Sequence, residues 1–377
     1  MKNIPLFKNT FNESHVNAIS EVISRKKYWA NGPEINLFEK QLSNFSDNKY
    51  GLVFNSGTSA GHALMDLHGV KGKEVIVPSF TFIATANSVL MAGGKPVFAD
   101  IENKSFGLDP KDVINKITDK TVAIMPIHYG GTMCDISPLK DIAKDKGLLL
   151  IEDAAESLGA TYDSKPAGSF GDSTWFSFTP TKVISTGEGG AIVTNDRELY
   201  ERAKLFRSHG RVENEDYFTS TQKMDYISLG YNFRMPSICA ALGIEQLRII
   251  EKLILRRQEI ARAYDSGLSN LSEIRVPHKF DNRRQIYQMY SILVNSGKDR
   301  RDKLQEYLKN KGITTKIYFD PIHLSKFYLK QGYDIKLDVT EETSDKILSL
   351  PIYPDLSIDE ISYVVESVKE FFLNKCY

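Results

Sequence analysis

Short apolar runs alternate with helical patterns between residues 50 and 153, and this alternation restricts the fold more than any other feature of the chain. The helical patterns lie near Thr58–Gly69, Ile83–Ala92, Pro110–Ile117 and Ser137–Lys146. Continuous apolar strands separated by helices favour a mostly parallel sheet with helices on both faces, so we expect an α/β fold. The predicted strands are Gly51–Phe54, Glu74–Pro78, Pro96–Ala99, Val122–Met125 and Leu148–Glu152.

The segments on either side of this region read as helical or mixed. Apolar residues recur at helical spacing in the first 45 residues, and one long helical pattern runs from about Pro236 to Ser266. The C-terminal part has α+β patterning, and Ser357 and Glu360 are spaced as a capping box before a closing helix at Ile358–Phe372. We therefore predict a large α/β domain over residues 1–245 and a smaller C-terminal α+β domain over 246–377.

Composition excludes several classes of function. Among the 377 residues, Lys plus Arg and Asp plus Glu balance at 48 each. The chain therefore lacks the excess of positive charge that is typical of proteins binding nucleic acid or an anionic membrane. The N-terminus lacks an apolar signal core, and no apolar run could span a bilayer. Cys134, Cys239 and Cys376 lack metal-ligand spacing. We expect a cytoplasmic protein with reduced thiols and no metal.

Polar groups follow four of the predicted strands, at Asn55–Ala60, Ser79–Phe82, His128–Gly131 and Asp153–Glu156. In open α/β sheets, ligands bind beyond the carboxyl ends of the strands. These groups therefore predict a ligand site at one edge of the sheet. His128 is the only histidine near it, and a structural role is the better interpretation.

Lys182 and Asp153 point to the chemistry of that site. Lys182 follows the aromatic run Trp175–Phe178 and precedes a glycine-rich turn before the strand Ala191–Thr194, where partial desolvation would make its amine nucleophilic. Asp153 directly follows an apolar strand and needs a partner for its charge. Pyridoxal phosphate (PLP) chemistry uses such a pair, because the amine forms a Schiff base and the acid keeps the pyridine nitrogen protonated.

Other side chains fit a phosphate-bearing aromatic cofactor, although each also has a plain structural reading. Gly57 permits close backbone approach, and Thr58 and Ser59 can cap a helix while offering hydroxyls to a phosphate. Ser177 suits a second phosphate contact, and Phe82 could stack on a flat ring or simply fill the core.

Three further residues each allow two roles. Glu156 is three residues beyond Asp153, within reach of the same ligand or solvated at a helix start. Asn232 and Arg234 precede the long helical pattern, where the guanidinium could bind a carboxylate or phosphate, or lie on the surface.

Taken together, the motifs resemble the DegT/DnrJ/StrS-type sugar aminotransferases, which are fold-type-I PLP enzymes that aminate nucleotide-linked ketosugars. The resemblance extends from WANGP at 29–33 to LSLPIYP at 348–354, in the order of that family. The motifs are NSGTSA, PSFTFIATAN, HYGG, EDAAESLGA, FSFTPTK, TGEGGAIVTND and GYNFRM.

The resemblance implies a role for each matching residue. Lys182 would be the Schiff-base lysine and proton shuttle, and Asp153 the partner of the pyridinium nitrogen. Glu156 occupies a position beside the cofactor's 3-hydroxyl where many members carry glutamine. Phe82 would stack on the ring. The implied phosphate contacts are Gly57, Thr58, Ser177 and, from the other subunit of a homodimer, Asn232, and we expect Ser59 beside them to bind the cofactor as well.

Substrate recognition is where the chain departs from the family pattern. Arg234 is the candidate for the carboxylate of the amino donor. Gln288 stands where many relatives have histidine, and the segment Ile317–Phe327 differs around its own histidine. We expect Tyr318 and His323 of this segment to contact the sugar.

The resemblance predicts a ping-pong aminotransferase that takes an amino group from an amino acid, expected to be L-glutamate, and passes it to a nucleotide-linked keto-deoxysugar. A sugar dehydratase of the same fold is one alternative, although such relatives carry histidine in place of Lys182. A ligand-sensing regulator and an aminotransferase for a non-sugar ring ketone are the others.

Overall fold

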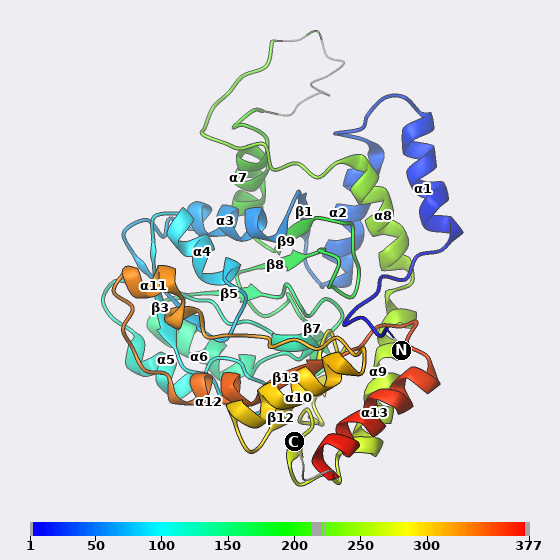
Figure 1. Cartoon of the computed structure of the whole chain (residues 1–377). Coiled ribbons are helices and arrows are strands. Elements are labelled where there is room, and N and C mark those ends of the chain that lie inside the picture. The colour runs from blue at the N-terminus through cyan, green and yellow to red at the C-terminus, as the bar shows by residue number, and fades with distance from the viewer. Residues whose placement is uncertain (1–2, 213–220, 222, 374–377) are drawn as a thin grey trace.

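A seven-stranded sheet forms the centre of the protein (Figure 1). The structure, a computed structural model, describes residues 3–212, 221 and 223–373. The strand order is β1-β9-β8-β5-β4-β2-β3. The strands span β1 Tyr50–Phe54, β2 Glu74–Pro78, β3 Lys95–Ala99, β4 Thr121–Ile124, β5 Leu149–Asp153, β8 Ser173–Ser177 and β9 Gly190–Thr194.

Five neighbouring strands, from β8 to β3, run parallel, whereas β9 runs antiparallel to both β1 and β8. The predicted mostly parallel α/β sheet is therefore confirmed, and each of the five predicted strands agrees with the structure to within one residue. Because β9 runs back beside β8, the last residue of β8 pairs with the first of β9, Ser177 with Gly190. The loop between them, residues 178–189, begins and ends at the carboxyl edge of β8.

Helices cover both faces of the sheet, because alternate residues of each buried strand face opposite sides. One face packs against α2 (Pro33–Phe45), α5 (Pro110–Lys116), α6 (Ile136–Lys146) and α8 (Ser237–Arg248). The other packs against α3 (Gly57–Leu67), α4 (Ala84–Met91) and α7 (Arg197–Arg207). The helix α1 (Glu13–Ser24) lies beside α8 (Figure 1).

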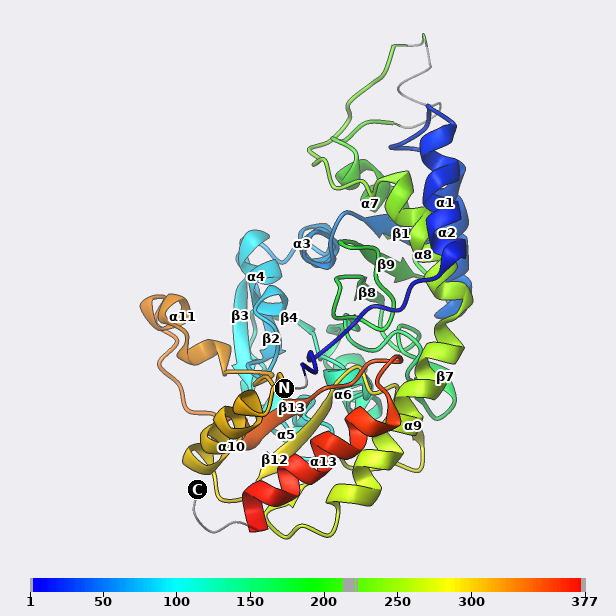
Figure 2. The ribbon, with the colours of Figure 1, turned by 45° about the vertical axis from the view of Figure 1, so that its right-hand side comes forward.

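The C-terminal part forms a second core around a three-stranded antiparallel sheet, seen below the large sheet in Figure 2. At the start of its last helix, the Ser357 and Glu360 side chains each accept a hydrogen bond from the other residue's backbone N–H, which confirms the capping box. The elements are β10 Ile274–Arg275, β12 Tyr290–Val294, β13 Ile347–Leu350, α9 Ile250–Leu268, α10 Lys298–Asn310, α12 Asp338–Lys346 and α13 Ile358–Leu373.

Short elements complete the chain. A small sheet joins β11 (Arg283–Arg284), β6 (Thr161–Tyr162) and β7 (Lys165–Pro166). The helical turns are η1 Tyr129–Gly131, η2 Ile322–Leu324 and α11 Lys326–Lys330.

The long helix predicted over Pro236–Ser266 is two helices. The backbone leaves the helical region at Ile249 (φ −107°, ψ 6°), which separates α8 from α9. Periodicity alone does not reveal this break, because apolar residues continue at helical spacing across it.

Two segments cross the predicted domain boundary. Ile4 pairs with Ile313 and is buried in the core of the C-terminal part. Conversely, Ile322, Tyr328 and Leu337 join the core of the large sheet. Both placements depend on contacts between residues far apart in sequence, which local patterns do not encode.

Within the described part of the chain, no helix combines the length and apolar character needed to cross a membrane. The same residues hold no group of three or more His, Cys, Asp and Glu side chains arranged for a metal ion. Cys134 and Cys239 are free thiols, and Cys376 lies outside the described residues.

Candidate functional site

A cavity of about 270 Å³ lies at the carboxyl edge of the large sheet. It brings together groups that follow β1, β2, β5 and β8, as expected for an open α/β sheet. Residues from the C-terminal part close one side. Its polar and aromatic lining comprises Ser56, Thr58, Phe82, Thr85, Asp153, Glu156, Trp175, Ser177, Thr179, Thr181, Lys182, Glu188, Lys316, Tyr318 and Phe319.

Asp153, the last residue of β5, places a buried carboxylate in the cavity wall. Thr85 Oγ1 donates a hydrogen bond to Oδ2 (2.6 Å), and the backbone N–H of Ala155 donates to Oδ1 (3.1 Å). Burial raises the pKa of Asp153 to about 6, although these two hydrogen bonds oppose the shift. The site therefore holds an acid that gains from a cationic partner.

Lys182 enters the same cavity from the loop 178–189. Its Nζ lies 3.3 Å from Glu156 Oε1, and its side chain is 14% exposed. The other carboxylate oxygen of Glu156, Oε2, accepts the backbone N–H of Gly130 (2.9 Å). Gln288 donates a hydrogen bond to the carbonyl of Thr181, next to the lysine. The Lys182 amine is thus held near the Glu156 carboxylate, and Gln288 holds the backbone of the loop beside it.

The N-terminus of α3 meets the end of β8 at Gly57. A Cβ at this position would lie 2.8 Å from the Cβ of Ser177, so only glycine allows the approach. Ser56, Thr58 and Ser177 line the cavity around this helix start. A helix N-terminus with several donors is a suitable site for a phosphate group.

The cap of α3 differs from the prediction. Ser56, not Thr58 or Ser59, is the N-cap, and its Oγ accepts the N–H of Ser59 (3.1 Å). The Ser59 hydroxyl donates to Asn55 Oδ1 (2.6 Å) and is absent from the cavity lining. Ser59 therefore supports the helix start rather than facing the cavity.

Phe82 does not fill the core. Its side chain is 58% exposed and lies at the cavity, with its ring centroid 6.5 Å from that of Phe319. An exposed ring of this kind is available for stacking on a flat ligand.

The predicted substrate residues separate into two groups. Tyr318 lines the cavity, and its carbonyl accepts a hydrogen bond from Tyr129 Oη (2.6 Å). His323 does not reach the cavity, because its buried ring contacts Ser79 Oγ (2.6 Å) and Glu341 Oε1 (3.4 Å). The structure thus places His323 outside the lining of this cavity, and its contact with the sugar stays a prediction.

Asn232 and Arg234 are likewise absent from the cavity lining of this single chain. Asn232 is exposed, and the backbone of Arg234 pairs with Phe54 at the end of β1.

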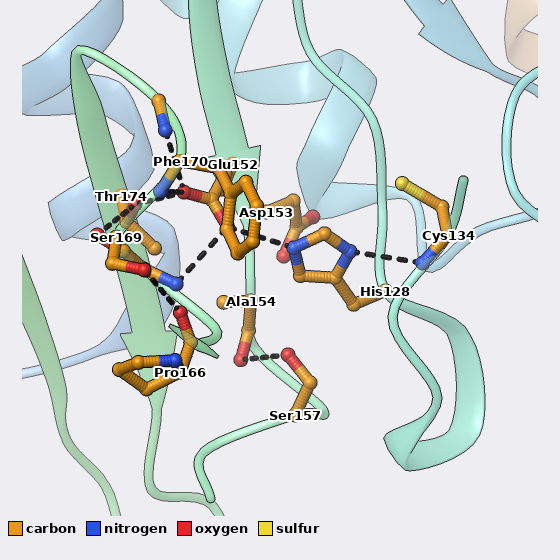
Figure 3. Close-up of polar contacts among 12 residues, drawn as sticks. His128, Cys134, Glu152, Asp153, Ala154, Ser157, Pro166, Ser169, Phe170 and Thr174 are labelled. Carbon is orange, nitrogen blue, oxygen red and sulfur yellow. Dashed lines mark hydrogen bonds and ion pairs between the residues drawn. The ribbon is translucent and has the colours of Figure 1, made fainter. Parts of the chain in front are cut away.

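His128 has a structural environment (Figure 3). Its Nδ1 accepts the N–H of Cys134 (3.3 Å), which assigns the proton to Nε2, facing Glu152 Oε2 at 2.9 Å. Glu152 also accepts the N–H groups of Gly168, Phe170 and Gly171. Burial would raise the pKa of Glu152, but His128 and these N–H groups outweigh it and lower the pKa.

Glu152→Gln should therefore destabilise the fold without removing a cavity group. An amide cannot accept all these donors, so we expect unfolding in urea to become easier by about 3 kcal/mol. Glu251→Gln, at an exposed pair with Arg284, should cost less than about 1 kcal/mol. Equal losses in the two variants would contradict the structural role.

Several contributors to the site were not predicted as site residues. Thr85 fixes Asp153, Gly130 fixes Glu156, and Glu188 and Lys316 line the cavity. The sequence could have indicated Thr85 as a site residue, because it lies one helical turn after Thr81, which belongs to the polar group following the predicted strand Glu74–Pro78. No local sequence pattern indicates Lys316, because its position depends on its pairing with Ser349, far along the chain.

Comparisons with known proteins agree with this geometry. The profile of the DegT/DnrJ/EryC1/StrS aminotransferase family matches residues 9–369. GDP-perosamine synthase from Escherichia coli O157:H7 is 34% identical over 376 residues, covering 100% of both chains. The structure of Helicobacter pylori PseC, an aminotransferase involved in the biosynthesis of pseudoaminic acid, has a TM-score of 0.93 at 31% identity, covering 99% of this chain and 100% of that one.

The PLP form of the putative sugar aminotransferase Spr1654 from Streptococcus pneumoniae matches with a TM-score of 0.92 at 26% identity, covering 98% of each chain. These matches span the large sheet and the C-terminal part alike. The chain belongs to the DegT/DnrJ/EryC1/StrS family of PLP-dependent aminotransferases.

Proposed function

We propose that this aminotransferase moves an amino group from L-glutamate to a nucleotide-linked keto-deoxysugar in the cytoplasm, using PLP held at the cavity of Lys182. The supporting observation is that a lysine amine and a buried carboxylate, 29 positions apart in sequence, line one cavity. The similarity to GDP-perosamine synthase favours a nucleotide-linked sugar as acceptor.

The residues present fit this cofactor. Asp153 offers a carboxylate whose pKa is raised by burial, and a protonated pyridine nitrogen would be a cationic partner for it. The close approach of Gly57 and Ser177 leaves a helix N-terminus and hydroxyls for the phosphate. The exposed ring of Phe82 would cover one face of the cofactor. When bound, PLP withdraws electrons from the amino-bearing carbon and so makes its proton acidic.

Lys182 would hold the aldehyde carbon of the cofactor and, once released by the donor amine, carry the proton between the reacting carbons. Glu156 lies 3.3 Å from the amine and would keep it aimed into the cavity while it is free. Thr85 would orient the Asp153 carboxylate through its 2.6 Å hydrogen bond.

The test follows the cofactor spectrum of the purified protein. Added L-glutamate should bleach the absorbance of the lysine-bound cofactor, and a nucleotide ketosugar should restore it, with an aminated sugar found by mass spectrometry. A panel of GDP- and UDP-linked 3-keto and 4-keto sugars identifies the acceptor. Recovery with release of ammonia would indicate dehydration, and absence of recovery with every ketosugar would reject this acceptor class.

Asn232 and Arg234 do not line the cavity of the single chain, and their absence from the lining motivates the proposal of a homodimer. Asn232 is exposed and precedes α8, so a second copy could present it to the phosphate in the first. We expect inactive Lys182→Ala and Asn232→Ala subunits, when mixed, to recover up to about a quarter of the activity, since random pairing forms mixed dimers in which one site is intact. Mixing Lys182→Ala with Lys182→Arg subunits is the control. Equal activity in both mixtures would contradict shared sites.

A further inference from the structure

A second cavity, larger than the first, lies between the large domain and the C-terminal part. Its volume is about 560 Å³, within the range of small-molecule sites. We call it the basic cavity. It is lined by Asn103, Lys104, Phe106, Arg262, Asp265, Ser266, Ser269, Arg275, Val276, Pro277, His278, Lys279, Ser291 and Leu293. It shares no lining residue with the cavity of Lys182.

The charge of this lining departs from that of the chain. The whole chain has equal numbers of cationic and acidic side chains, whereas the basic cavity has four cationic side chains and one carboxylate, Asp265. That carboxylate is already engaged, because Oδ1 accepts from Tyr290 Oη (2.7 Å) and Oδ2 lies 3.0 Å from Lys279 Nζ. The remaining cations, Lys104, Arg262 and Arg275, therefore face the cavity with no uncommitted acid in its lining.

These cations come from separate segments that the fold brings together. Lys104 belongs to the loop after β3, Arg262 to α9, and Arg275 to β10. Arg275 Nη2 donates to the carbonyl of Asn103 (2.9 Å), which fixes one guanidinium beside the loop. Several cations in the lining of one cavity suit a ligand with more than one anionic group, and guanidinium groups match phosphate oxygens in geometry.

Part of the lining is apolar. Phe106 and Leu293 are buried side chains of the lining, and Val276 and Pro277 also line the cavity. Ser266 and Ser269 add hydroxyl-bearing residues to the lining. A ligand with an apolar or flat part as well as phosphates would contact both surfaces.

We propose that the basic cavity binds a small molecule carrying two or more phosphate groups, at a site separate from that of Lys182. This binding does not depend on the proposed transamination, so either can fail without the other. Because the cations are exposed, affinity should fall as salt rises.

Calorimetric titration of inorganic pyrophosphate into the cofactor-loaded protein at low salt tests the proposal. We expect the Lys104→Ala/Arg262→Ala variant to bind at least about tenfold more weakly than the unmodified protein, because two charge-assisted contacts are lost. Both side chains are exposed, so the fold should persist. The matched control is Lys252→Ala/Lys303→Ala, which removes two exposed lysines outside the cavity and should leave affinity unchanged.

Hydrogen exchange locates the binding. Pyrophosphate should slow exchange in residues 103–106 and 262–279 of the unmodified protein and not of the double variant. Equal affinity in all three proteins would overturn the proposal. So would protection confined to residues 56–59 and 177–182, because that would place the anion at the cavity of Lys182.

Discussion

Lys182→Ala should abolish transamination, with kcat/KM falling on the order of 10⁴-fold or more, because one amine supplies both the covalent anchor and the proton carrier. The ion pair with Glu156 places this amine in the cavity. Borohydride reduction of the PLP-loaded protein, followed by peptide mass spectrometry, should find the cofactor on Lys182. The spectrum of the variant should lack the absorbance of the lysine-bound cofactor.

Two variants distinguish imine formation by Lys182 from the effect of a positive charge in the cavity. Lys182→Arg keeps a cation beside Glu156 but cannot form the imine, so it should be as inactive as the alanine variant. Lys316→Ala removes the other lysine that lines the cavity, and it should retain lysine-bound cofactor. Reduction that labels Lys316 in the unmodified protein would refute the assignment.

Asp153→Asn should have the second-largest effect. An amide cannot form an ion pair with a protonated pyridine nitrogen, so we expect kcat/KM to fall by about 10²- to 10³-fold, as when one member of a buried charge pair is lost. The amide oxygen can still accept the backbone N–H of Ala155 and the amide nitrogen can donate to the Thr85 hydroxyl, so we expect the side chain to keep its position. Thr85→Val should produce a smaller loss. A similar kcat/KM for Asp153→Asn and the unmodified enzyme would show that this carboxylate does not act on the cofactor.

The same substitution should stabilise the cofactor-free protein at neutral pH. Burial raises the pKa of Asp153 to about 6, so the ionised form costs stability once both folded and unfolded states are deprotonated. The advantage of Asp153→Asn should be absent below pH 4, develop as pH rises from about 4 to 6, and remain constant above, at up to about 3 kcal/mol. Thermal unfolding across this range measures it. A constant difference at all pH values would contradict the shifted pKa.

Much of the large domain could be predicted because its strands are buried on both faces. Continuous runs such as Glu74–Pro78 mark such strands directly, and the groups at their carboxyl ends then had to meet at one edge. Asp153, Lys182, Gly57 and Ser177 were found for this reason, since each lies at a strand end or in the loop between paired strands.

The features that the sequence did not predict depend mainly on contacts between residues far apart in the chain. Nothing near Ile4 signals that it pairs with Ile313, and nothing near His323 signals that its ring is enclosed by Ser79 and Glu341. The direction of β9 was also unpredicted, because a buried apolar strand looks the same in either direction.

The reversed strand β9 makes the lysine loop an exchangeable unit. Residues 178–189 leave and rejoin the sheet at the directly paired Ser177 and Gly190. A loop of another length could therefore keep the strand register, provided that it retains the buried Phe178, Val183 and Ile184 in the core. Loop grafts between homologous enzymes would thus alter the reach of the reactive amine while the rest of the scaffold stays unchanged. Directed evolution toward bulkier ketones could begin from such chimeras.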